Sequence, residues 1–241
     1  MMNEWREAVR LAMFEWKASW RGLFRNFLYC GLLFMLFKLL LDGGSASFAT
    51  LSTVLLFGLT ASLSNIGQTK LFRPQRINSG TYADPQIFML RTLAVPRGVI
   101  VKRQYVLVLL RSLPWLVSMF VLLYFATPDR HLVIPAAAFI AFACMWISLG
   151  LTAGGLDLVF SIQPILFRWL GYILIIPFIL VMSSLFVLTE SNTGQKILYW
   201  PIHAAEFYPL VTIIISFATA TASSVLWQAL LKRRLERIDL L

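Results

Sequence analysis

The sequence predicts an all-α integral membrane protein with six transmembrane helices, an amphipathic helix before them and both termini in the cytoplasm. Two observations support this fold class. Of the 241 residues, 59% are hydrophobic and only 13% are charged, about half the charged fraction of a typical soluble domain. The cations also gather between alternate apolar segments. Lipid is therefore the solvent that this composition requires.

Six segments qualify as membrane spans, because a helix needs about 20 apolar residues to cross the hydrocarbon layer. The first is short and must borrow length from the residues before it, whereas the fourth contains no charge at all. The predicted spans are residues 27–41, 48–68, 105–126, 132–153, 165–188 and 207–230. Together they make up a transmembrane domain over residues 27–231.

The cations predict the orientation of these spans. With a cytoplasmic N-terminus, seventeen of the 21 Lys and Arg residues lie on the cytoplasmic side, and only Arg130 and Lys196 lie outside. This asymmetry is the positive-inside bias of membrane proteins. It accounts for the formal charge of +10, so we expect no nucleic-acid partner. We expect a multi-pass protein of the cytoplasmic (inner or plasma) membrane.

Residues 1–26 are predicted to form an amphipathic helix at the membrane surface. Trp5, Val9 and Trp16 recur at helical spacing, and Arg10 is among the cations that flank this apolar stripe. Tryptophan and arginine on such a helix are typical of the headgroup region. The alternative is one long first span with a soluble extension.

The loop at 69–104 is the longest hydrophilic segment and contains a predicted short helix. Asp84-Pro85 is a typical helix start, with an N-cap acid followed by proline at the first helical position, and Ala94-Val95-Pro96 ends the helix. Apolar residues beside arginine are typical of binding hot spots. The alternative is an amphipathic loop resting on the membrane. The candidate contact residues are Phe88, Met89, Leu90, Arg91, Leu93 and Arg97.

This loop, together with the predicted topology, resembles the type-2 ABC transporter permeases, in which the corresponding stretch often reads L-L-x-T-L-P-V-S-R-x-E-I-V-x-x-K-Y. The matching residues are Leu90, Thr92, Leu93, Val95, Arg97, Ile100, Val101 and Tyr105. The proline is displaced to Pro96, and Val99 replaces the family's glutamate.

The resemblance implies that the short helix is a coupling helix, which sits in a cleft of a separate ATPase subunit. It further implies a second permease subunit, the same or a related chain, and an exporter. ATP and Mg would be bound by the partner ATPase and not by this chain. The sequence contains no G-x-x-x-x-G-K-[ST] loop, so an ATP-driven process requires that partner.

We expect no catalytic, cofactor or metal site in the chain, because it lacks H-E-x-x-H and G-x-S-x-G. Two alternatives remain open. One is a non-transporting membrane scaffold or assembly protein. The other is an intramembrane lipid-modifying enzyme, which would need a nucleophile with its base or a metal constellation.

Several further positions are candidates for function or packing. Asp157 and Gln163 mark a second cytoplasmic contact or a plain capping turn. Arg111, two turns inside the third span, is either functional or snorkels to the inner surface. Gly150 and Gly154 have the small-xxx-small spacing of close helix packing, within the chain or at a dimer seam.

Three remaining segments complete the predicted organisation. The polar run at 216–224 in the sixth span could line a path or bond to neighbouring helices. The outer loop at 189–206 is aromatic and predicts short interfacial helices. Residues 232–241 are expected to be a basic cytoplasmic tail.

Overall fold

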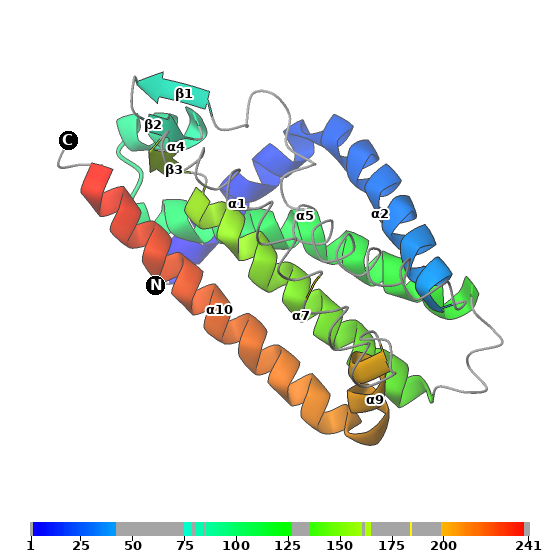
Figure 1. Ribbon diagram of the computed structural model, residues 1–241. Coiled ribbons are helices and arrows are strands. Elements are labelled where there is room, and N and C mark those ends of the chain that lie inside the picture. The colour runs from blue at the N-terminus through cyan, green and yellow to red at the C-terminus, as the bar shows by residue number, and fades with distance from the viewer. Residues whose placement is uncertain are drawn as a thin grey trace.

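The computed structural model describes residues 2–41, 75–78, 81–83, 85–126, 135–160, 162–164, 184 and 199–238. This part of the chain is mostly helical, as predicted (Figure 1). The predicted second span and, apart from Ser184, the predicted fifth span lie outside it.

Three of the described helices are long and apolar enough to cross a membrane, over Arg97–Ala126, Ala136–Gly155 and Pro209–Glu236. They belong to α5 (Arg97–Ala126), α7 (Ala136–Phe160) and α10 (Pro209–Ile238). These helices correspond to the predicted third, fourth and sixth spans. Two of them extend further than predicted, because α5 includes the last eight residues of the loop at 69–104, and α10 continues into the predicted tail.

The N-terminal region forms two helices, α1 (Met2–Ala18) and α2 (Trp20–Leu41), separated by a turn at Ser19. The break therefore falls earlier than the sequence predicted, because the interfacial helix was expected to end at residue 26. α2 covers the predicted first span together with seven residues before it, 22 residues in all, but it is not one of the three described helices that are long and apolar enough to cross a membrane.

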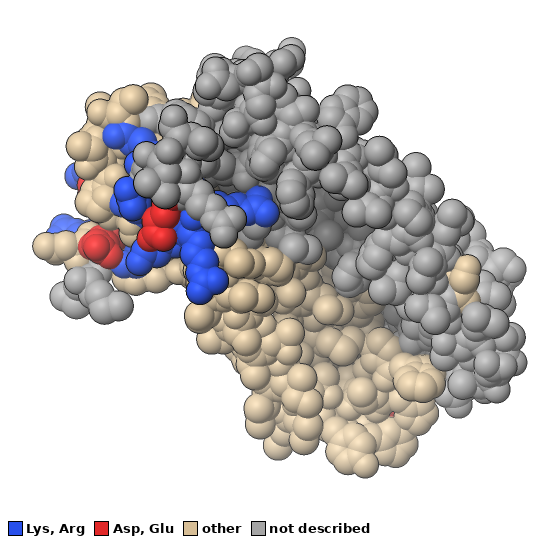
Figure 2. Space-filling view, turned by 60° about the vertical axis from the view of Figure 1, so that its left-hand side comes forward, with Lys and Arg blue, Asp and Glu red and all other residues tan. Residues whose placement is uncertain are grey.

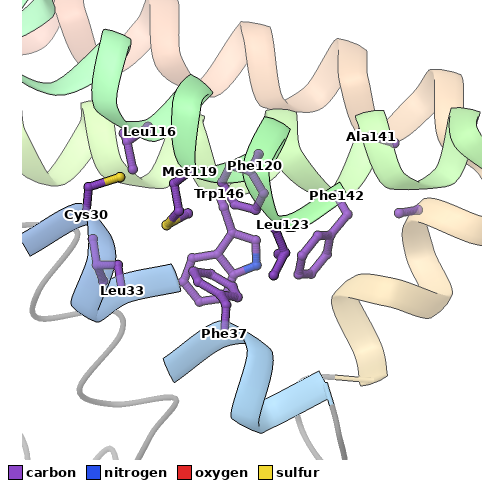
Figure 3. Close-up of a cluster of buried hydrophobic side chains, with 11 residues drawn as sticks. Cys30, Leu33, Phe37, Leu116, Met119, Phe120, Leu123, Ala141, Phe142 and Trp146 are labelled. Carbon is purple, nitrogen blue, oxygen red and sulfur yellow. The ribbon is translucent and has the colours of Figure 1, made fainter. Parts of the chain in front are cut away.

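An aromatic core joins α2 to α5 and α7 (Figure 3). The Phe37 ring lies edge-on to Trp146, with centroids 5.1 Å apart, and to Phe120 at 5.5 Å. Edge-to-face pairs of this kind add to the stabilisation from burial. The buried members are Cys30, Leu33, Phe37, Leu116, Met119, Phe120, Leu123, Ala141, Phe142, Trp146 and Ala205.

Hydrogen bonds connect α7 and α10 along the polar run of the predicted sixth span. The Ser148 hydroxyl donates to the carbonyl oxygen of Ser216 at 2.7 Å. The hydroxyls of Thr152 and Ser223 lie 3.0 Å apart, and Trp227 Nε1 donates to the carbonyl oxygen of Thr152 at 3.0 Å. Hydrogen bonds of this kind stabilise helix association in membranes, where burial of apolar surface contributes little to the association of helices. The sequence left open whether this run lines a path or bonds to neighbouring helices, and these contacts are bonds between helices.

The glycines of α7 permit close packing within the chain. A Cβ at Gly150 would lie 2.9 Å from Leu116 Cδ1, and one at Gly155 would lie 2.1 Å from Trp227 Cδ1. Gly154 is buried as well. Gly150 therefore packs on α5 of the same molecule.

The two ends of the helical array differ in what they carry. The charge of Lys232, near the end of α10, contributes to lowering the pKa of the Glu4 carboxyl. The start of α1 therefore lies near the end of α10, and both termini lie at this end in Figure 1. At the other end, α9 (Tyr199–Phe207) precedes α10, as the predicted interfacial helices of the outer loop would.

Near the termini, a small sheet that the sequence did not predict joins two loops. It consists of β1 (Gln75–Asn78), β2 (Thr81–Ala83) and β3 (Ile162–Pro164) in the order β1-β2-β3, with antiparallel pairing. Between β2 and α5 lies the short helix α4 (Pro85–Thr92).

We predict that Gly155→Ala lowers the thermal unfolding midpoint of the detergent-solubilised protein. The new methyl group overlaps the Trp227 ring, and overpacking of this kind costs about 1–3 kcal/mol. Gly31→Ala is the matched control, because nothing lies within 4 Å of a Cβ at Gly31. The control should equal or exceed the parent midpoint, and equal midpoints for the two variants would contradict this packing.

Candidate docking site

The short helix α4 begins and ends where the sequence predicted. Its first residue is Pro85. At its end, Ala94 adopts a positive φ of 55°, and Val95 N–H donates to the carbonyl oxygen of Leu90 at 3.0 Å. This is a Schellman-type ending, with the chain turning back on the last helical residues. The turn leads directly into α5 at Arg97.

The two sides of α4 have opposite environments. Ile87 and Leu90 are buried, whereas Met89 and Leu93 are 52% and 65% exposed. Leu90, one of the predicted contact residues, is therefore not on the exposed side. The side chain of Phe88 lies outside the described residues.

The buried side of α4 belongs to a second apolar cluster that includes α5 and α10. Arg91 reinforces this attachment, since its Nη1 donates to the carbonyl oxygen of Leu235 at 3.3 Å. Arg97 is exposed at the first position of α5. The cluster consists of Ile87, Leu90, Ile100, Val101, Val108, Leu231 and Leu235.

The sheet brings the second predicted contact region to the same place. In the β2–β3 register, Gln163 pairs with Tyr82, two residues before the N-cap position of α4. Asp157 lies in α7, and its side chain is outside the described residues. The loops that precede α4 and follow α7 are thus joined by backbone hydrogen bonds.

Beside this site, a buried carboxylate lies between two arginines. Glu15 of α1 is 1% exposed, and both of its oxygens accept from α5. Arg103 Nη2 donates to Oε2, and Arg111 Nη2 donates to Oε1 at 2.5 Å. Arg111 is therefore held by an ion pair inside the protein and does not snorkel to the inner surface; a functional role for this charge stays a prediction.

The carbonyl of Arg111 is also engaged. Asn26 Nδ2 of α2 donates to it at 3.2 Å, and Cys30 Sγ donates to the carbonyl of Trp115 at 3.3 Å. These contacts flank Pro114, which lacks an N–H and disturbs the hydrogen-bond ladder of its helix. Side chains from a neighbouring helix commonly bond to backbone groups near such a proline in membrane proteins.

A second ion pair attaches the start of α1. Glu4 is paired with Lys102, whose ammonium group also lies 5.4 Å from the centroid of the Trp5 ring. The hydrogen bond and charge of Lys102 lower the pKa of the Glu4 carboxyl below its usual value. This attraction is therefore present at neutral pH and is lost only as the pH falls through that lowered pKa.

Sequence reasoning missed Glu15, because its role depends on a partner helix about 90 residues away in the chain. The available signal was a carboxylate at helical spacing from Ala8 and Ala12. All three are buried, so they form the side of α1 that packs in the protein.

No protein-family model, curated protein or solved structure matches the chain.

We predict that Glu15→Gln destabilises the protein by about 3 kcal/mol, because it leaves two buried guanidinium groups without their shared carboxylate. The matched control is Glu7→Gln, which removes the same charge from a half-exposed position of the same helix and should stay within about 0.5 kcal/mol. Thermal unfolding in detergent measures both. Equal stability of the two variants would show that the buried pairs do not hold α1.

Proposed function

We propose that the chain is the permease subunit of an ATP-driven ABC exporter, and that a separate ATPase subunit docks on α4. The observation that carries this proposal is the division of α4 into a buried and an exposed side. Met89 on this short helix and Leu93, directly after its last residue, are exposed apolar anchors. Arg91 and Arg97 lie nearby, and arginine is common among the anchors of protein interfaces.

The attachment of α4 supports a role in transmitting force. Its buried side packs against α5 and α10, two of the helices that can cross a membrane. A partner that moves α4 would therefore move the inner ends of both helices. A loosely attached loop could bind a partner but could not do this.

The remaining features of the proposal come from the sequence. The chain would have six spans with both termini in the cytoplasm, in line with its distribution of cations. Because the sequence lacks a P-loop, ATP and Mg would bind to the partner subunit. Two permease subunits, identical or related, would enclose the pathway, since six spans alone enclose little volume.

We predict that Met89→Asp and Leu93→Asp each reduce the amount of P-loop ATPase that co-purifies with the tagged chain by at least tenfold. A carboxylate in a desolvated interface costs several kcal/mol, and about 1.4 kcal/mol corresponds to a factor of ten. The measurement is the ratio of ATPase to chain after purification in mild detergent.

Phe207→Asp is the matched control, because Phe207 is 65% exposed, like Leu93, but is the last residue of α9, which precedes the end of α10 that is remote from α4. It should retain the parent ratio. If the α4 variants also retain the ATPase and transport, α4 is not the docking element, and a non-transporting scaffold becomes the better account.

A further inference from the structure

Packing on α5 gives α1 four distinct sides. The side that faces the protein carries Ala8, Ala12 and Glu15, all buried. The small alanines allow close approach of the two helices, and Glu15 supplies the ion pairs to Arg103 and Arg111. The tryptophan stripe predicted from the sequence is therefore not the packed side.

Two of the other sides are accessible and differ in chemistry. Next to the packed side is an apolar side on which Trp5 and Val9 are 37% and 43% exposed. Beyond it, and opposite the packed side at 3.6 residues per turn, lie three exposed cations, Arg6, Arg10 and Lys17. No acidic residue lies among these three on the helix surface.

The acids of α1 lie elsewhere on the helix. Glu7 falls on the side opposite Trp5 and Val9, so the helix is apolar in one direction and acidic in the other. Glu4 lies between this acidic side and the packed side and pairs with Lys102 of α5. Phe14 is exposed on this acidic side and is separate from the apolar side that Trp5 and Val9 form. The cations thus lie at the boundary between an apolar layer and water.

The ion pairs also fix how α1 lies relative to α5. Glu4 pairs with Lys102, and Glu15 pairs with both Arg103 and Arg111. These contacts attach α1 to the first half of α5, the half that begins at Arg97. If α5 crosses a membrane, α1 lies near its surface.

The surroundings carry the same charge. Figure 2 shows Lys and Arg gathered at one end of the visible face, with a smaller area of Asp and Glu among them. Lys232 and Arg233, at the end of α10, are exposed, and Lys232 lies close enough to affect Glu4. This end of the molecule is electrostatically complementary to an anionic surface.

We infer that Arg6, Arg10 and Lys17 form a face that binds the headgroups of anionic phospholipids, with Trp5 and Val9 inserted beside them. The lipid contact and the protein contact occupy opposite sides of α1, so both form at once. The inference does not depend on transport or on an ATPase partner.

The test uses the full chain in phosphatidylcholine vesicles that contain a minority of brominated phosphatidylglycerol or brominated phosphatidylcholine. Quenching of tryptophan fluorescence gives the relative affinity for the two lipids. The parent should prefer the anionic lipid. The triple variant Arg6→Gln, Arg10→Gln, Lys17→Gln should lose about 10- to 100-fold of this preference at low salt, because it removes three cations that attract the anionic surface.

The control is Arg6→Lys, Arg10→Lys, Lys17→Arg, which keeps all three charges and should keep the preference. A parent with no preference, or a triple Gln variant that matches the parent, would overturn the inference. A triple Gln variant that keeps its lipid preference but no longer co-purifies with the proposed ATPase subunit would also overturn the inference. In that case the basic face would belong to a protein interface.

Discussion

The packing of α1 on α5, at the end of the molecule where both termini lie, depends on one buried carboxylate. Glu15 brings a negative charge into a site where two guanidinium groups of α5 are also buried. Charges removed from water are costly unless they are paired, and removal of one partner leaves the others uncompensated. Separating α1 from α5 would therefore leave buried charges unpaired, so these ion pairs hold α1 on α5. They also determine which sides of α1, the apolar and the basic, face away from the protein.

A second constraint connects α4 to the same helix. The Schellman-type turn at Ala94 places Val95 against the second apolar cluster, and α5 starts at once. Arg91 ties α4 to the last turns of α10. The sheet adds the loop that follows α7 through Gln163. An ATPase docked on α4 would thus act on α5 and α10 together, which is why α4 is a better candidate for coupling than a free loop.

Local signals in the sequence predicted much of this structure. Hydropathy located α5, α7 and α10, and the proline at position 85 located the start of α4. Contacts between distant segments could not be predicted in the same way. Nothing near Glu15 in the chain indicates that its partners lie in α5, and the strand at 162–164 is too short for a periodic signal. The turn at Ser19 and the helical extension of α10 depend similarly on packing against other helices.

The most direct test of the proposed docking site is native mass spectrometry of the unmodified chain, extracted in mild detergent and followed by sequencing of its bound proteins. The account predicts a stoichiometric complex that contains a P-loop ATPase and two permease subunits. A chain that remains alone, or whose stoichiometric partner has no nucleotide-binding loop, would contradict the assignment of α4 as a coupling element.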